Sequence, residues 1–247
     1  MSRLTGLLPL ALLLVVWQLV GPERSVTFPR PSTWLAGLQG MYLEGTLLPA
    51  VGTTLLTFVA SLIVATGVGA AVGIVMGASQ RIDRAFTPIL DFFRSLPPPA
   101  IVPVAGLILG LTLVTNVVIV VIGIVWPILL NTISGMHDVP RVRLDMARSL
   151  GLTPIERLTK VVLPSLAPRI MLGVRTAASI SLILTLLVDM LGTGDGLGRQ
   201  LLLHQQRFQA NAVWGLLLVT GFFGYAANTL IVVGERYALR HWPEGMR

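Results

Sequence analysis

The sequence predicts an all-helical integral membrane protein with six membrane-crossing segments. Hydrophobic residues make up 54% of the 247 residues and charged residues only 12%, whereas a soluble domain is about one quarter charged. The mean hydropathy is +0.81, and several apolar runs approach the ~20 residues that cross a bilayer as a helix. Because so few charges could not cover a water-facing surface, the bilayer is the expected solvent.

Six apolar runs are spread along the chain without an internal repeat or linker, so we expect a single domain over residues 1–247. The first run follows Arg3, but no small-x-small cleavage site comes after it, so we interpret it as a membrane helix rather than a signal peptide. The third run is short and opens with three prolines, Pro97 to Pro99. The expected spans are about 6–21, 47–77, 98–110, 115–135, 167–190 and 212–234.

The distribution of positive charge orients the chain, because cytoplasmic loops carry the excess of Lys and Arg. With the N-terminus inside, the inner segments hold thirteen such residues: Arg3, Arg81, Arg84, Arg94, Arg141, Arg143, Arg148, Arg157, Lys160, Arg169, Arg236, Arg240 and Arg247. The outer segments hold four: Arg24, Arg30, Arg199 and Arg207. The sequence therefore predicts a multi-pass protein of the bacterial plasma (inner) membrane, surrounded by lipid, with both termini and residues 136–166 in the cytoplasm.

Composition excludes several function classes. The net charge of +7 comes from cations scattered between apolar runs, without the basic, aromatic-interleaved patch of a nucleic-acid-binding surface, so nucleic acid is not an expected partner. The chain has no cysteine, and its three histidines, His137, His204 and His241, lie far apart without ligand spacing. We therefore expect neither thiolate chemistry nor a metal site.

The second run carries Gly69, Gly73 and Gly77 four residues apart. On a helix these glycines form a stripe along which another helix backbone can approach closely. General enrichment of small residues in membrane helices is the alternative. We interpret the stripe as a helix-packing face.

Residues 136–166 carry the densest charge of the chain and are patterned as two short amphipathic helices. Asp138 is expected to cap the first, whose apolar side holds Val139, Val142, Met146 and Leu150 at helical spacing. Gly151 fits the left-handed position that ends a helix.

The second short helix begins at Thr153, with Pro154 at its first position and Glu156 as capping-box partner, and we expect Pro164 to end it. Such a loop either docks on a partner or lies on its own transmembrane bundle. The pattern alone leaves both possibilities open.

The loop also carries a recognisable motif. Asp145-Met146-Ala147, Gly151, Val161 and Leu163-Pro164 have the spacing of, and resemble, the EAA loop of permease subunits in binding-protein-dependent ABC importers. Asp replaces the usual Glu, Met the first Ala, and Val the usual Ile. Other segments are similar to the nitrate, sulfonate and taurine branch of this family: Phe28-Pro29-Arg30-Pro31-Ser32, Arg94-Ser95-Leu96-Pro97, Ala100, Pro103, Pro127, Leu130-Asn131-Thr132, Asp189-Met190-Leu191-Gly192 and Gly196-Leu197-Gly198.

The resemblance implies the six-helix transmembrane domain of a type I ABC importer, with residues 136–166 as its cytoplasmic coupling loop. It implies two ATPase subunits, a second permease copy (a homodimer is expected) and an extracytoplasmic solute-binding protein. When the ATPases of such importers close on ATP, the loop moves with them and the permease swings from inward-open to outward-open. The residues expected to couple to the ATPase are Asp145, Met146, Ala147, Leu150, Gly151, Leu163 and Pro164.

The energy for transport is expected to come from another polypeptide, because the P-loop sequence G-x-x-x-x-G-K-[ST] is absent. We therefore expect no catalytic residues and no cofactor in this chain, with ATP and Mg bound by the partner ATPase. The competing interpretation is an ion-coupled secondary transporter or channel, which needs ionisable groups deep in the membrane. Apart from Arg169 at the inner end of the fifth span, only Arg175 and Asp189 fall within the expected spans, and Arg175 is close enough to a helix end to reach the interface.

Ser181, Thr185 and Asp189 recur every four residues in the fifth span and so share one helix face. We expect them to line the translocation path, with hydrogen bonding between helices as the alternative. The resemblance favours a small anion as the solute, such as a sulfonate, nitrate, bicarbonate or an organic carboxylate. A vitamin precursor is the alternative solute.

Four glycines between residues 192 and 198 leave the backbone free for tight turns, and the stretch 201–208 is helical in pattern but too polar to span. We interpret this region as a partly re-entrant hairpin that contacts the binding protein or gates the outer mouth. A flexible loop is the alternative.

Overall fold

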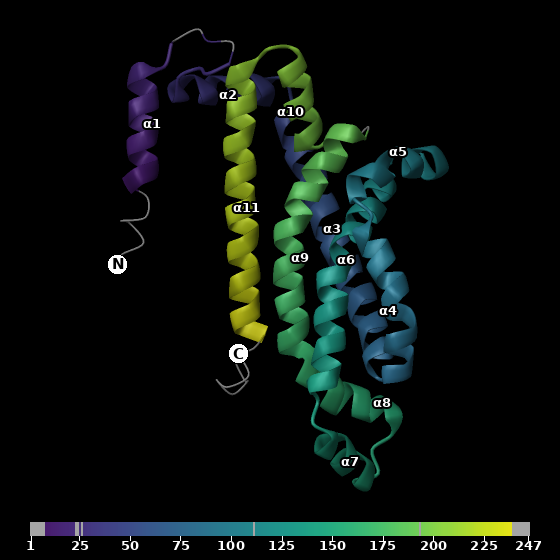
Figure 1. Cartoon of the computed structure of the whole chain (residues 1–247). Coiled ribbons are helices and arrows are strands. Elements are labelled where there is room, and N and C mark those ends of the chain that lie inside the picture. The colour runs from purple at the N-terminus through teal and green to yellow at the C-terminus, as the bar shows by residue number, and fades with distance from the viewer. Residues whose placement is uncertain (1–7, 23–24, 26, 111, 193, 239–247) are drawn as a thin grey trace.

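Four long helices form the body of the protein and lie side by side in the computed structural model (Figure 1). The structure describes residues 8–22, 25, 27–110, 112–192 and 194–238, and every regular element in that part of the chain is helical. The long helices are α3 (Leu47–Gly77), α6 (Leu113–Asp138), α9 (Leu163–Leu191) and α11 (Ala210–Ala238). Each is long and apolar enough to cross a membrane, and together they cover four of the six expected spans.

The third expected span is a broken pair of helices rather than one short helix at residues 98–110. Helix α4 (Gln80–Ser95) and helix α5 (Pro98–Leu109) meet at a bend of 88°, and together they qualify as a fifth crossing. Leu96 and Pro97, between them, are both extended. Each precedes a proline, and the ring of a proline disfavours the helical conformation of the residue before it. The sequence analysis missed α4.

The first expected span corresponds to α1 (Leu8–Val20), which has 13 residues and so a length of about 20 Å, short of the ~30 Å hydrocarbon core. Residues 6 and 7, and both ends of the chain, lie outside the described residues. Figure 1 shows α1 displaced from the long helices. It contacts the bundle through Trp17, whose ring lies 4.6 Å from that of Trp214 and 5.2 Å from that of Trp34.

Short helices cover one end of the bundle. The turn η1 (Pro31–Thr33) leads into α2 (Trp34–Leu43), and α10 (Leu197–Gln206) connects α9 to α11 at the same end (Figure 1). Helix α10 is packed rather than loose, since Leu197, Gly198 and His204 are buried. The segment after α9 therefore contains a helix that packs against the bundle, and not the flexible loop of the alternative interpretation.

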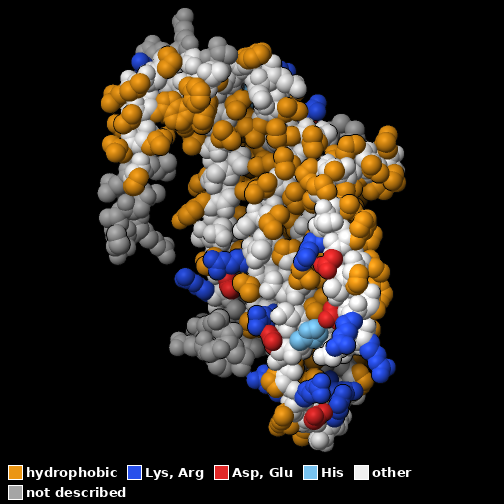
Figure 2. All heavy atoms as spheres, in the orientation of Figure 1, with side chains coloured by type: hydrophobic (Ala, Val, Ile, Leu, Met, Phe, Trp, Pro, Cys, Tyr) orange, Lys and Arg blue, Asp and Glu red, His pale blue; other side chains and the backbone are white. Residues whose placement is uncertain are grey.

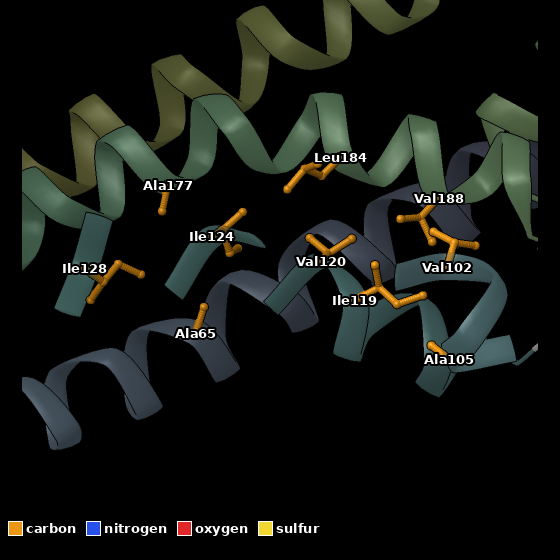
Figure 3. Packing of buried hydrophobic residues seen from close by; sticks show 10 residues of the cluster. All are labelled: Ala65, Val102, Ala105, Ile119, Val120, Ile124, Ile128, Ala177, Leu184 and Val188. Atoms are coloured by element: carbon orange, nitrogen blue, oxygen red, sulfur yellow. The ribbon is translucent and has the colours of Figure 1, made fainter. Parts of the chain in front are cut away.

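The main apolar core surrounds α6, which lies between α3 and α9 (Figure 3). Its central members come from α6 and are all completely buried: Ile119, Val120, Ile124 and Ile128. Residues of three other helices close the cluster: Ala65, Val102, Ala105, Ala177, Leu184 and Val188.

The glycine stripe of α3 is the face that packs against α6, as predicted. A Cβ on Gly69 would lie 3.0 Å from the Ile128 side chain, one on Gly73 would lie 2.6 Å from the Thr132 Cβ atom, and one on Gly77 would meet Met136 at 2.5 Å. Real Cβ atoms almost never come within 3.0 Å of another heavy atom, so a side chain at Gly73 or Gly77 requires the facing residues or helices to shift.

Substituting Gly73 tests this contact. Gly73→Ala is expected to lower the free energy of unfolding by about 1–3 kcal/mol, because the added methyl group overlaps Thr132 and the helix backbones must separate. Thermal unfolding of the purified protein in detergent measures the change. Gly67→Ala is the matched control, since nothing lies within 4 Å of a Cβ there. Equal stability of the two variants would contradict the close α3–α6 contact.

Candidate functional site

The loop between α6 and α9 projects from one end of the bundle as a small helical unit. It consists of α7 (Arg141–Ser149), α8 (Pro154–Arg157) and a π-helical turn, η2 (Leu158–Val162), that runs directly into α9. Figure 2 shows Lys, Arg, Asp and Glu side chains gathered at this end, whereas hydrophobic side chains dominate the other end of the visible face. The structure thus places the charge-rich loop away from the apolar body.

Gly151 ends α7 in the way the sequence predicted. Its φ is +71°, in the left-handed region that glycine adopts without steric cost. Its N–H donates to the carbonyl of Arg148, and the N–H of Leu152 donates to the carbonyl of Ala147. These two bonds satisfy carbonyls that the end of the helix leaves free, and they form a Schellman motif.

Thr153 begins the next helix with the predicted capping box. Its Oγ1 accepts a hydrogen bond from the Glu156 N–H at 3.3 Å, while Glu156 Oε2 accepts one from the Thr153 N–H at 3.0 Å. Lys160 Nζ lies 2.9 Å from Glu156 Oε1. The Schellman motif at the end of α7 and the capping box at the start of α8 therefore follow each other directly, and together they set the angle between the two helices.

Two expectations for this loop were wrong. Pro164 does not end a helix, because the π-helical turn before it leads into α9 and the chain is helical from Pro154 to Leu191. The wider turn accommodates the missing N–H of the proline. Asp138 does not cap α7: it is the last residue of α6, and its Oδ2 pairs with Arg169 Nη2 at 2.6 Å, which joins the ends of α6 and α9.

The apolar side chains of the loop divide into two sets rather than forming one face. The inner set lies against the bundle, where Val139 and Val162 pack around Leu166, and Ala147 is only 3% exposed. Ala147, which was expected to couple to the ATPase, is thus already buried within this chain. The outer set is exposed: Val142, Met146, Leu150 and Ile155.

The remaining predicted coupling residues are at least partly exposed. Asp145 lies at the surface and pairs with Arg148 at 3.0 Å. Leu163 is 38% exposed, and Pro164 is half-buried at the start of α9. The loop thus rests on its own bundle, as one of the two alternatives has it, and it also presents an exposed apolar surface with charges beside it.

Ser181, Thr185 and Asp189 do share one face of α9, but that face points into the bundle. All three are completely buried. The Ser181 and Thr185 hydroxyls have no hydrogen-bond partner among the described residues. In this conformation none of the three lies on a surface that water reaches, so a path along them would require the bundle to open.

Asp189 instead joins three helices at the end of the bundle opposite the loop. Thr54 of α3 donates its hydroxyl to Asp189 Oδ2 at 2.8 Å, and the same oxygen of Thr54 accepts the Leu197 N–H at 2.8 Å. The N–H of Gly198 also donates to the Asp189 carboxylate. A carboxylate on α9 therefore holds the start of α10 against α3, which corresponds to the interhelical alternative for this residue.

This arrangement explains the glycines after α9. A Cβ on Gly196 would overlap the Asp189 carboxylate, one on Gly198 would overlap the Leu186 carbonyl, and one on Gly194 would lie 2.8 Å from Asn116 Nδ2. The glycines are required by close packing, not by flexibility. Thr193 lies outside the described residues.

Thr54 and Asn116 belong to this buried polar cluster, and the sequence analysis did not single them out. Both are at most 4% exposed, and Asn116 lies in the first turns of α6. The available signal was a polar side chain near the end of an apolar span, because such residues face other helices rather than lipid. Which helix each one faces is not encoded in that signal.

A bundle of apolar spans with a folded polar loop at one end is the architecture of a membrane permease. The chain belongs to the family described as binding-protein-dependent transport system inner membrane component, whose model matches residues 63–240. It is accordingly a multi-pass membrane protein and a permease subunit of an ABC importer, and such systems include an ATPase and a substrate-binding protein. It is a component of a transport system.

Several curated proteins are similar over most of the chain. The putative aliphatic sulfonates transport permease protein SsuC of Bacillus subtilis (strain 168) is 25% identical, covering 95% of this chain and 86% of that protein. The taurine transport system permease protein TauC of Escherichia coli (strain K12) is 28% identical over 76% of this chain and 72% of its own length. The bicarbonate transport system permease protein CmpB of Synechococcus elongatus is 27% identical, covering 72% and 64% respectively.

Solved structures share the fold. A chain of the MetNI methionine ABC transporter in an inward-facing conformation superimposes with a TM-score of 0.68 at 19% identity, covering 79% of this chain and 97% of that one. A chain of an amino acid ABC transporter crystallised with histidines gives 0.63 at 16% identity, covering 81% and 97%. The fold is that of type I ABC importer permeases.

The buried cluster around Asp189 gives a test. Gly196→Ala is expected to destabilise the permease by about 1–3 kcal/mol, because the methyl group and the carboxylate cannot occupy the same space. Membrane yield and thermal unfolding in detergent measure the loss. Gly52→Ala, near Thr54 on α3 but with nothing within 4 Å of its Cβ, should behave like the unmodified protein. A fully stable Gly196→Ala variant would show that Asp189 does not pack there.

Proposed function

We propose that this permease conducts a small anion, such as a sulfonate, nitrate, bicarbonate or an organic carboxylate, delivered by an extracytoplasmic solute-binding protein. The permeases named above for aliphatic sulfonates, taurine and bicarbonate support this class. Two copies of this chain would form the path and two ATPase subunits would drive it. ATP and Mg would be bound by the ATPases and not by this chain.

The loop is the proposed docking site for the ATPase, and the observation that carries this proposal is the outer apolar set on α7 and α8. Val142 is 68% exposed, Met146 59%, Leu150 75% and Ile155 75%. Apolar side chains exposed together, with charged residues around them, are typical of a surface that a partner covers. The charged residues beside them would set the register of docking more than its strength.

The proposed orientation places the loop, both termini and the start of α4 in the cytoplasm, with α2 and α10 on the outer side. The excess of Lys and Arg in the loop and its neighbours supports this orientation. One of the thirteen residues counted as cytoplasmic does not lie in a loop. Arg94 lies at the end of α4, within the broken span. The bias remains large without it.

The docking surface can be tested by adding one negative charge at either of two neighbouring positions, the exposed Leu150 or the buried Ala147. Leu150→Glu is expected to insert and fold normally, because residue 150 is exposed, yet to lose the ATPase on purification. A charge buried unpaired at an interface costs on the order of 2–5 kcal/mol. Ala147→Glu is the matched control: its buried position predicts low membrane yield of the permease itself.

Gly151→Val gives a second variant for the same measurement. Nothing lies within 4 Å of a Cβ there, so only backbone strain at positive φ acts, and α7 should be misaligned relative to α8. We expect normal yield with reduced ATPase retention. Normal retention in both Leu150→Glu and Gly151→Val would refute docking at this loop.

The orientation can be tested by side-specific labelling, because the chain has no cysteine. Cysteines introduced at His137, near the end of α6, and at Gln205, on α10, are at exposed positions. In intact cells an impermeant thiol reagent should label Gln205→Cys and leave His137→Cys unlabelled until the cells are opened. Labelling of both from outside would overturn the orientation.

A further inference from the structure

Helix α4 packs against α3 and also touches α6, to which it runs in the opposite direction. Near its start, Asp83 Oδ2 is 3.7 Å from Nε2 of His137, at the end of α6. Two turns later, Leu90 packs against Leu129 and Ile133 of α6. Because both helices rise about 1.5 Å per residue, Arg94 is level with the middle of α6, a helix that crosses the membrane.

The two sides of α4 differ sharply in chemistry. One side carries apolar residues at spacings of three and four: Ile82, Phe86, Ile89 and Phe93. The opposite side, which we call the polar arc, carries polar residues at the same kind of spacing: Arg84, Thr87, Asp91, Arg94 and, one residue further, Ser95. At 100° per residue the centres of the two sets lie on opposite sides of the helix.

Among the described residues, nothing covers the polar arc. No residue of α4 is buried. Arg94 Nη2 lies 3.1 Å from Asp91 Oδ1, and these side chains remain 50% and 56% exposed. A charged face at the middle of a bilayer does not face lipid, so the apolar side of α4 meets the lipid and the polar arc turns toward water or protein in the assembled importer.

Of these two surroundings, the Arg94–Asp91 pair favours water over a dry protein interface. A guanidinium has five N–H donors in a planar fork, and the contact with Asp91 engages only Nη2. A dry protein interface would have to satisfy every remaining donor, whereas a water-filled path leaves them available to solvent and to an anion. Arginine also binds planar or trigonal oxyanions through paired N–H donors.

We propose that the polar arc of α4 lines the solute path and that Arg94 binds the anionic group of the solute there, with Asp91 holding the guanidinium in place. This inference rests on the proposed function, because it takes the solute to be a small oxyanion and the path to lie between two copies. It assigns a role to the segment Arg94-Ser95-Leu96-Pro97, which the docking loop does not explain.

Cysteine accessibility in the complete importer tests the water-filled path. Ser95→Cys, on the polar arc, and Phe93→Cys, on the apolar side at the same depth, are each treated in membrane vesicles with a water-soluble thiosulfonate, with and without ATP. We expect Ser95→Cys to react at least tenfold faster than Phe93→Cys in one or both conditions. Protection of Ser95→Cys in both conditions, or equal rates at the two positions, would overturn the inference.

The charge of the reagent tests Arg94 itself. At Ser95→Cys, the rate with anionic 2-sulfonatoethyl methanethiosulfonate, which carries a sulfonate, is divided by the rate with the cationic trimethylammonioethyl reagent. Replacing Arg94 with Gln should lower this ratio about tenfold, because a positive charge concentrates anions in a narrow path, and Arg94→Lys should largely preserve it. An unchanged ratio in Arg94→Gln would remove Arg94 as the anion-binding residue.

Failure of this inference and failure of the proposed function give different results. Labelling reports the surroundings of residue 95 whether or not an ATPase is bound. If the ATPase co-purifies while Ser95→Cys is protected, the importer function stands and α4 does not line the path. If Ser95→Cys behaves as expected while no ATPase co-purifies with the unmodified permease, the assignment of α4 stands and docking is refuted.

Discussion

The close approach of α6 to its two neighbours is the constraint on which the rest of the structure depends. Ile128 touches both sides: a Cβ on Gly69 of α3 would lie 3.0 Å from its side chain, and a Cβ on Gly173 of α9 would lie 2.8 Å from its Cα atom. In lipid, helices gain little by hiding apolar surface from each other, so tight packing across small residues supplies the association. Glycines on both neighbours therefore fix α6 as the central helix of the bundle.

The positions of both ends of the bundle follow from this contact. At one end, the Asp138–Arg169 pair and the cluster around Leu166 seat the loop on α6 and α9. At the other end, Asp189 holds α10 against α3. The chain is helical from Pro154 to Leu191, so one continuous helix connects the edge of the proposed ATPase-docking surface to the buried polar cluster around Asp189. Such a helix can transmit movement of the loop across the membrane without new contacts.

Local signals in the sequence predicted local structure well. The four long spans followed from length and apolar composition, and the glycine stripe from its spacing. The ends of α7 and α8 followed from Gly151 and from the Thr153–Glu156 box, because these motifs close hydrogen bonds within a few residues. The sequence analysis noted the three prolines after Leu96 without inferring a break between two helices. It missed the helical spacing of Ile82, Phe86, Ile89 and Phe93, which indicates the amphipathic α4.

The sequence by itself determined that the chain is a helical membrane protein with a structured, charge-rich loop, since solvent preference and capping depend on residues near one another. Only the tertiary structure decided which polar groups meet. Asp189 was expected to line the translocation path and is buried against Thr54, and Ala147 was expected to couple to the ATPase and is buried within this chain. Helical periodicity shows which residues share a face, but what that face meets depends on helices distant in sequence.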